Sequence, residues 1–323
     1  MTDQQDPAEP VVDVHALDVG HGACTVVFVA GDGHTKSVLI DCGMKRGQPD
    51  IANKLLLLRK RVVELLRKHE VTHLDAIIVS HSDEDHTRGL SGFVDQFSKQ
   101  GGTIGTVYAN RDRPGIPGMF QEFLEFISKK GARKVKSIKG ATERRVLSAG
   151  ACAIRILAPE EENVTVEGGE RSSNHLSAIV RIINDDTSLL VCGDAPATVV
   201  SELSHAVKNV DVLLASHHGG NMSEKDSEVN DAYALLNPRL VVFSAGHATT
   251  LCERQLTAIA NTGAALMCTG VTKACNISST KCAGDIAIQL RTGKRFVTDP
   301  PVNTHQVSVK LYTPRACKQI NRD

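Results

Sequence analysis

Short apolar runs rich in β-branched residues open the chain and predict strands. Residues 11–17 and 24–30 are valine-rich, and Gly31-Asp32-Gly33 is a hairpin signal that returns the chain into a third run at 37–40. The chain is therefore predicted to begin with a β-meander.

Further along, strand patterns alternate with helix patterns. Residues 51–70 place Leu55, Leu58 and Val62 at helical spacing with basic residues between them. Further strands are predicted at 74–80, 106–109, 151–157, 177–183, 188–192, 210–215, 240–243 and 285–290, and further helices at 90–97, 119–127, 196–207, 231–236 and 253–261. This order favours an α/β fold in which sheets are sandwiched between helices.

Composition is consistent with one large globular domain. The 323 residues are 41% hydrophobic and 23% charged, and no Gly-, Ser- or Pro-rich linker divides them. We predict a disordered N-terminus at 1–10, a single domain over 11–300 and a C-terminal tail at 301–323, in which 307–311 is a candidate edge strand.

The net charge and the cysteine content bear on the cellular compartment and the partners of the protein. The formal net charge is zero, so binding to nucleic acid would need a local basic surface. No apolar run reaches the roughly 20 residues of a membrane helix, and the first ten residues do not resemble a signal peptide. Nine cysteines without a CxxC pair indicate reduced thiols, the series Cys268, Cys275, Cys282 included. These features predict a cytoplasmic protein with no membrane contact.

Candidate metal ligands are concentrated in the segment His81-Ser82-Asp83-Glu84-Asp85-His86, which lies between a predicted buried strand and a predicted helix. Two imidazoles and three carboxylates crowded into six positions favour a bound cation. Chance assembly of a polar turn is the alternative for this segment taken alone.

Two later strands also end in candidate ligands. Asp194 follows the run at 188–192, and His217-His218 follows the run at 210–215. Each has a simpler explanation, a helix cap for Asp194 and a hydrogen-bonded pair for the histidines. Candidate ligands follow three separate predicted strands, and this repetition favours a metal site, because rigid scaffolds place functional groups on such loops. The set holds no cysteine and suits two divalent ions, Zn²⁺ or Mn²⁺.

The chain resembles the metallo-β-lactamase superfamily, and within it the hydrolase domain of competence DNA-uptake proteins of the ComEC type. The superfamily pattern H-x-H-x-D-H is present with Asp83 in place of the second histidine, which is the ComEC-like variant. The other matching segments, in order, are Leu17-Asp18-Val19-Gly20-His21-Gly22, Leu39-Ile40-Asp41-Cys42-Gly43, Asn174-His175-Leu176-Ser177, Gly193-Asp194-Ala195 and His217-His218-Gly219-Gly220. The similarity runs from about residue 13 to residue 290.

The resemblance implies an αββα sandwich, with two mixed β-sheets packed face to face and helices outside. It implies that His81 and Asp83 bind one ion, that Asp85 and His86 bind the other, and that Asp194 bridges them.

It further implies that His217 or His218 completes the second ion, with His218 preferred. His175 is included as a ligand. Asp41 is expected to orient the motif from behind, and we group it with Asp85 and His217 as catalytic residues.

Two positions depart from the pattern of the family. His21 stands where the family has glutamine, and His175 where it has its second asparagine. The late G-H-P segment has no clear counterpart in 244–252, and the membrane channel usually attached to this domain is absent from the sequence. DNA transport is therefore not implied.

We predict hydrolysis of a phosphodiester, as a phosphodiesterase or nuclease, through a metal-activated hydroxide. The stretch Lys129–Arg145 carries eight basic residues against Glu143 and is a candidate contact for phosphates, although a solvated edge strand explains it equally well. The alternatives are a hydrolase of small esters, lactones or amides on the same scaffold, and a binding or regulatory module without turnover. Protein partners are not predicted.

Overall fold

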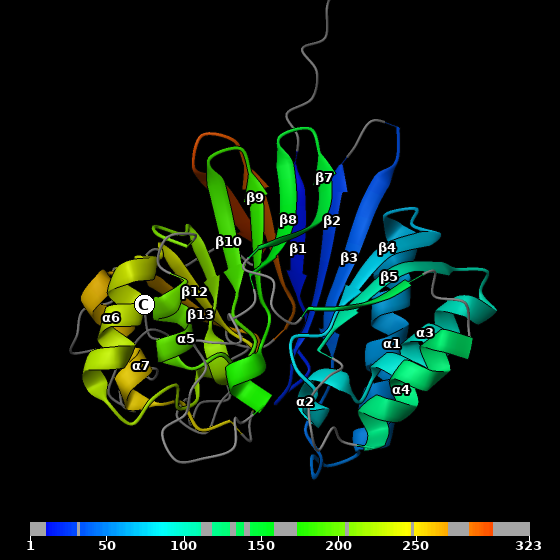
Figure 1. Ribbon diagram of the computed structural model, residues 1–323, viewed down its shortest axis with the longest axis horizontal. Coiled ribbons are helices and arrows are strands. Elements are labelled where there is room, and N and C mark those ends of the chain that lie inside the picture. The colour runs from blue at the N-terminus through cyan, green and yellow to red at the C-terminus, as the bar shows by residue number, and fades with distance from the viewer. Residues whose placement is uncertain are drawn as a thin grey trace, which may run out of the picture.

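The computed structural model describes residues 11–30, 33–110, 118–129, 134–138, 143–157, 173–203, 207–246, 249–270 and 284–299 (Figure 1). In these ranges the strands form an eight-stranded and a seven-stranded sheet that pack face to face. Helices cover the outer faces of both sheets, so the predicted αββα sandwich is confirmed.

The first sheet is mixed. Its strands, in spatial order, are β15 (Arg295–Asp299), β14 (Ile286–Arg291), β1 (Val12–Ala16), β2 (Cys24–Ala30), β3 (Thr35–Cys42), β4 (His73–Ile78), β5 (Thr103–Ala109) and β6 (Lys134–Ser137). Pairing is antiparallel from β15 to β3 and parallel from β3 to β6. The parallel half needs crossover helices, and α1 (Ile51–Lys68), α3 (Leu90–Lys99) and α4 (Gly118–Lys129) supply them.

The second sheet is also mixed. Its order is β13 (Ala265–Cys268), β12 (Leu240–Phe243), β11 (Val212–Leu214), β10 (Thr187–Val191), β9 (Ile179–Asn184), β8 (Cys152–Leu157) and β7 (Arg144–Ala149). Strands β10 to β13 are parallel, and β7 to β10 are antiparallel. Helices α5 (Ala197–Glu202), α6 (Asp226–Leu236) and α7 (Glu253–Thr262) lie beside the parallel half (Figure 1).

Three apolar layers hold these elements together, because strand side chains alternate between faces. Val12, Val14, Ile154 and Ile156 are among the residues that fill the space between the sheets. Leu58 and Val62 of α1 pack with Leu39 on the outer face of the first sheet. Residues of α5, α6 and α7 pack on the second sheet in the same way.

Most predicted elements are present, with differences at short ones. The turn Glu84–Thr87 forms the short helix α2, where a loop was predicted. Strands β7, β13 and β15 were not predicted, and α6 begins five residues before the predicted 231. The proposed terminus at 1–10, the candidate strand at 307–311 and the cysteines Cys275 and Cys282 lie outside the described residues.

Among the described residues, none of the helices is both long enough and apolar enough to cross a membrane.

Candidate metal centre

Side chains that can bind a metal gather at one edge of the sandwich. His81 to His86 follow β4, Asp194 follows β10, and His217 and His218 lie in the 3-10 turn η2 (Ser216–Gly219) after β11. His21 comes from the turn between β1 and β2. Both sheets therefore contribute donors to one place.

One donor group is fully buried and consists of His81, His86 and Asp194. Nε2 of His86 lies 3.1 Å from Oδ1 of Asp194, and Nε2 of His81 lies 3.7 Å from Oδ2 of the same carboxylate. Two ligands that are each about 2.1 Å from one ion lie roughly 3 to 3.5 Å apart, so these separations are close to those of a coordinated set.

The second donor group consists of His21, Asp85 and His218. Oδ2 of Asp85 lies 3.4 Å from Nε2 of His21 and 3.9 Å from Nε2 of His218. The two groups adjoin, because Nε2 of His218 is 3.2 Å from Nε2 of His86.

The residues present fit a divalent cation. Nε2 of His81 is buried and has no hydrogen-bond partner, an arrangement that costs free energy unless something else satisfies the nitrogen. A cation between the imidazoles and Asp194 would satisfy it and would also neutralise the buried carboxylate. Imidazole and carboxylate ligands without thiolates are typical of zinc and manganese sites.

Asp41 contacts His86 of the first donor group at the ring nitrogen that faces away from Asp194. Its Oδ2 lies 2.7 Å from Nδ1 of His86 and accepts a hydrogen bond from Oγ of Ser80 at 2.6 Å, while Oδ1 accepts one from the backbone N of Ser80 at 2.8 Å. The bond at Nδ1 fixes the imidazole with Nε2 toward Asp194. Asp41 is itself buried, so its contact is with the ring of His86 and not with solvent.

Backbone contacts place the motif loop. The N of Ala23 donates to the O of Asp85 at 2.9 Å, and the N of Gly89 donates to the O of Cys42 at 2.7 Å. At Gly43 the chains approach so closely that a Cβ would lie 2.3 Å from the backbone of Asp85. The glycines of the two N-terminal motifs therefore allow the β1–β2 turn and the end of β3 to pack against this loop.

His217 and His218 both adopt left-handed backbone angles, with φ of 54° and 55°. Consecutive non-glycine residues in this region are strained, and such strain concentrates at functional sites. The side chains diverge: His218 is buried, whereas the His217 side chain is 37% exposed. Nδ1 of His217 donates a hydrogen bond to the carbonyl O of Asn221 at 2.7 Å, and Nε2 lies 3.8 Å from Oδ2 of Asp194.

Burial and mutual contacts shift the pKa values of the donors. Burial lowers the pKa of His218 to about 4 and, together with His86, lowers that of His81. Burial opposes ionisation of Asp194, yet His86 and His218 hold the pKa of its carboxyl well below its usual range. His81 and His218 are therefore neutral near pH 7 and Asp194 is charged, as metal binding requires. Asp194 and Asp41 raise the pKa of His86 against the effect of its burial, so an ion would have to displace a proton from this ring.

The predicted ligands do not all enter the two groups. Asp83 has a 40% exposed side chain at the rim, 3.7 Å from Nε2 of His81. His175 lies in the 3-10 turn η1 (Ser173–Leu176), is half-buried and belongs to neither group.

The pairing also differs from the expectation, because His86 stands with His81 and Asp85 stands with His21. Successive residues of the helical turn α2 point about 100° apart, so neighbours in sequence face different groups.

Sequence reasoning missed His21, which was treated as a departure from the family pattern. The available signal was an imidazole between two glycines, Gly20 and Gly22, in the turn after a predicted strand.

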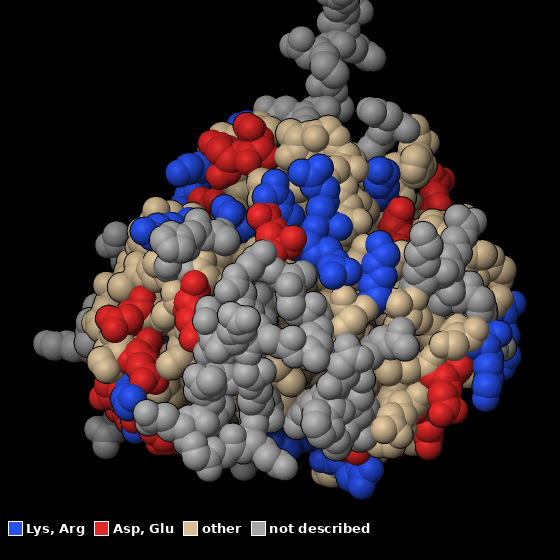
Figure 2. Space-filling view, viewed as in Figure 1, with Lys and Arg blue, Asp and Glu red and all other residues tan. Residues whose placement is uncertain are grey.

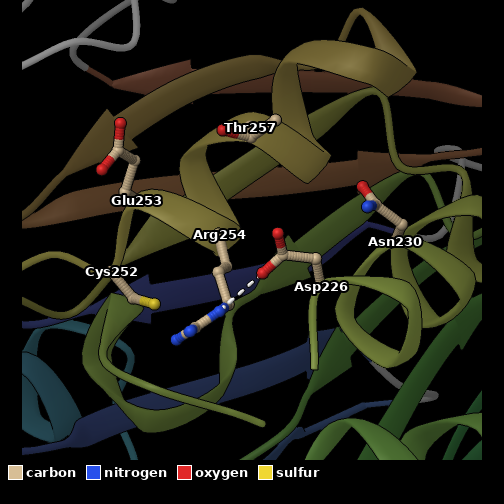
Figure 3. A pocket seen from close by; sticks show the side chains of 6 residues that line it. All are labelled: Asp226, Asn230, Cys252, Glu253, Arg254 and Thr257. Carbon is tan, nitrogen blue, oxygen red and sulfur yellow. Dashed lines mark hydrogen bonds and ion pairs between the residues drawn. The ribbon is translucent and has the colours of Figure 1, made fainter. Parts of the chain in front are cut away.

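A separate hollow lies between α6 and α7 and is shown in Figure 3. Asp226, Cys252 and Arg254 are among its lining residues, and Nε of Arg254 donates to Asp226 at 2.6 Å. It contains no member of the two donor groups.

Known proteins resemble part of this chain. Residues 19–120 match the family model described as the metallo-beta-lactamase superfamily. The chain is 24% identical over 245 residues to Recombination protein 2 of Haemophilus influenzae, an alignment that covers 74% of this chain and 25% of the relative. The chain thus spans about a quarter of the length of the curated relative that it matches.

Solved structures resemble the chain at low sequence identity. Unliganded yeast PDE1 superposes with a TM-score of 0.50 at 10% identity, over 81% of this chain and 98% of that protein. The metallo-beta-lactamase fold protein YhfI from Bacillus subtilis gives a TM-score of 0.49 at 15% identity, over 80% of this chain and 96% of that protein. The matched segment includes His21 and the whole motif 81–86. Residues 19–120 therefore resemble the metallo-beta-lactamase superfamily, and the two-sheet fold of the described chain agrees with that resemblance.

Proposed function

We propose that the chain is a binuclear phosphodiesterase or nuclease. The observation that carries this proposal is the contact between the two donor groups, where Nε2 of His86 and Nε2 of His218 are 3.2 Å apart and Asp194 borders both. Two adjacent divalent ions suit the hydrolysis of a phosphodiester, in which both the attacking and the leaving oxygen carry charge.

A divalent cation bound there acidifies water and stabilises charge that develops on a phosphoryl oxygen. The side chains of the protein orient the donors and transfer protons. Asp41 fixes the ring of His86, and the peptide carbonyl of Asn221 fixes the ring of His217. Nε2 of His217, whose side chain is partly exposed, would then take up a proton and return it to the leaving oxygen.

Two features favour a phosphodiester over a small ester. The donors are imidazoles and carboxylates, which bind the hard ions that phosphoryl transfer uses. The relative named Recombination protein 2 points to nucleic acid as the substrate class. We propose Zn²⁺ or Mn²⁺ as the resident ions, two per chain.

Replacing His21 with glutamine, the residue that ComEC-type proteins carry there, is expected to weaken binding of the second ion by roughly 10- to 100-fold while leaving the first equivalent in place. The reason is that His21 supplies one of three donors in its group and none in the other. Calorimetric titration of metal-free protein with Mn²⁺ measures both equivalents.

His73→Gln is the matched control, because His73 lies at the opposite end of β4 and bonds Thr103. Its titration is expected to match that of the parent. Equal loss of both equivalents in His21→Gln would show that the two groups act as one site.

An assay panel tests the activity itself. Purified protein with Mn²⁺ or Zn²⁺ is expected to cleave bis(p-nitrophenyl) phosphate and single-stranded DNA, and to act poorly on p-nitrophenyl acetate and lactones. The reverse preference would establish the small-ester hydrolase instead. Two bound ions with no turnover on any substrate would establish a binding module.

A further inference from the structure

The backbone of the turn η2 needs support from outside the turn. His217 and His218 both have left-handed angles, which are costly for residues with a Cβ and persist only where surrounding contacts enforce them. The N of His217 donates to the O of Gly193 at 2.9 Å, and the N of Cys252, at the start of α7, donates to the O of Gly219 at 2.7 Å. The turn is therefore attached both to the loop after β10 and to α7.

Gln255, in the first turn of α7, bonds the backbone on both sides of the strained residues. Its Nε2 donates to the O of Ser216 at 3.2 Å and to the O of Gly220, which are the carbonyls just before and just after His217–Gly219. The side chain of Gln255 is fully buried. Both N–H groups of one buried amide thus hold the two ends of η2.

Tyr233 of α6 fixes the orientation of this amide. Its hydroxyl donates to Oε1 of Gln255 at 2.6 Å. The carbonyls of Ser216 and Gly220 can only accept hydrogen bonds, so the nitrogen of the amide must face them and its oxygen must face the hydroxyl. A chain of hydrogen bonds therefore runs from α6 through α7 to the turn.

The contact between Tyr233 and Gln255 lies beneath the charged surface of these helices. Figure 2 shows Asp and Glu side chains at the left of this face, where α6 and α7 lie in Figure 1. Tyr233 instead packs in the apolar layer on the second sheet, and both it and Gln255 are buried. Water does not compete for hydrogen bonds at such a place, and removing one partner leaves a buried polar group unsatisfied.

The turn determines where the ring of His218 lies. Nε2 of His218 is 3.9 Å from Oδ2 of Asp85 in the second donor group and 3.2 Å from Nε2 of His86 in the first. Metal ligands must be placed to within a few tenths of an ångström. If φ of His218 relaxed from 55° to the negative values that most residues adopt, its ring would point in another direction.

We propose that Gln255, fixed by Tyr233, is a positioning residue of the metal centre. It holds η2 in its strained form and thereby presents Nε2 of His218 to the second ion. Gln255 acts through the carbonyls of Ser216 and Gly220 and is not a catalytic residue. This inference rests on the proposed function for the second ion, but not for the contacts of the turn.

The first test needs no metal. Gln255→Met keeps the length of the side chain and removes both donors, whereas Tyr233→Phe removes only the hydroxyl. In EDTA, hydrogen exchange of residues 216–220 is measured by mass spectrometry. Exchange should be roughly 10-fold faster in Gln255→Met and about 3-fold faster in Tyr233→Phe than in the parent, because the turn opens more often. Exchange at the parental rate in Gln255→Met would overturn the inference.

The second test is calorimetric titration of the metal-free protein with Mn²⁺. Gln255→Met should weaken the second equivalent by roughly 10- to 100-fold and the first by less than about 3-fold, which is the size of effect expected when a group that orients a ligand is lost. A merely structural role would not distinguish the two equivalents. Faster exchange of the turn with both equivalents at parental affinity would contradict the positioning role.

Asn184→Leu is the control for loss of stability. Asn184 is also a fully buried amide, and its Nδ2 donates to the O of Leu290 at 2.9 Å. It is six residues beyond Ala178, whose N bonds the O of Ser80 beside the motif 81–86, and this is roughly 20 Å along the strand. Urea unfolding should show a loss of stability in Asn184→Leu, while exchange of residues 216–220 and both metal equivalents stay parental. Selective loss of the second equivalent here as well would attribute the effect to general destabilisation and overturn the inference.

Asn261→Ala is the control for the contact between the two helices. Nδ2 of Asn261 in α7 donates to Oδ1 of Asn230 in α6 at 3.3 Å, at an exposed position. This variant loses a hydrogen bond between the same helices but none to η2, so it should match the parent in both tests. A change as large as that of Gln255→Met would show that any loosening of α6 against α7 is sufficient, and would contradict the specific role of Gln255.

The outcomes separate this inference from the proposed function. If the parent binds a single equivalent, or cleaves no phosphodiester, the proposed function fails, and hydrogen exchange in EDTA still decides whether Gln255 holds the turn. If the parent binds two ions and cleaves bis(p-nitrophenyl) phosphate, but Gln255→Met matches it in exchange and in titration, only the inference about Gln255 fails.

Discussion

Asp194→Asn is expected to lower turnover by roughly 1000-fold and to reduce bound metal below one equivalent. The carboxylate oxygens of Asp194 lie 3.1 to 3.8 Å from imidazole nitrogens of four histidines, so no other side chain borders as many donors in the described site. An amide has nearly the same shape but lacks the negative charge, and its NH₂ group cannot bind a cation. Elemental analysis and steady-state kinetics with bis(p-nitrophenyl) phosphate measure both effects.

Asp211→Asn is the matched control. Asp211 is also a buried carboxylate in the second sheet, but it accepts a hydrogen bond from Ser188 N at 2.9 Å and pairs with Arg239. This change should cost about 1–3 kcal/mol of unfolding free energy and leave metal content intact. Full metal content and turnover in Asp194→Asn would show that the donors lie elsewhere.

Gly43→Ala is expected to destabilise the fold by about 1–3 kcal/mol and to weaken metal binding by roughly 10- to 100-fold. The new methyl group would lie 2.3 Å from backbone atoms of Asp85 and His86, and backbone atoms cannot rotate away as a side chain can. The loop must shift, and with it a member of each donor group. Urea unfolding in EDTA and calorimetric metal titration separate the loss of stability from the loss of binding.

Gly118→Ala is the control for adding a methyl group. Gly118 begins α4, and a Cβ there meets no heavy atom within 4 Å. Alanine should stabilise this helix by about 0.5–1 kcal/mol and leave the metal titration unchanged. Parental stability and parental metal affinity in Gly43→Ala would contradict the close packing at this position.

The sequence predicted the core of the fold because its strands are distinctive. The run Cys24–Ala30 was predicted at its observed bounds, as was Leu240–Phe243, since valine-rich segments between turn residues have few other interpretations. Strand β15 (Arg295–Asp299) was missed because it is short and has charged residues, Arg295 and Asp299, at its ends, so it lacks the apolar pattern of a strand. Helix α6 was predicted too short because its first turn, from Asp226, is polar.

The site was only partly predictable. A family pattern brought His81, His86, Asp194 and His218 together, and they do meet. The position of His21 depends on how the β1–β2 turn packs on the motif loop, which is a contact between segments 60 residues apart and leaves no periodic signal. The pairing of Arg145 with Arg155, and of Arg155 with Arg181, likewise depends on strand register, which sequence patterning leaves open by steps of two residues.

The donors come from both sheets, with His81, Asp85 and His86 in the first and Asp194 and His218 in the second. An ion bound by these donors would therefore connect the two sheets. Ligands that bind only the native state raise its stability, by about 4 kcal/mol at a thousand times the dissociation constant. Starving a cell of the metal would thus loosen the two halves and expose the chain to proteolysis, so that metal supply sets the abundance of the enzyme as well as its activity.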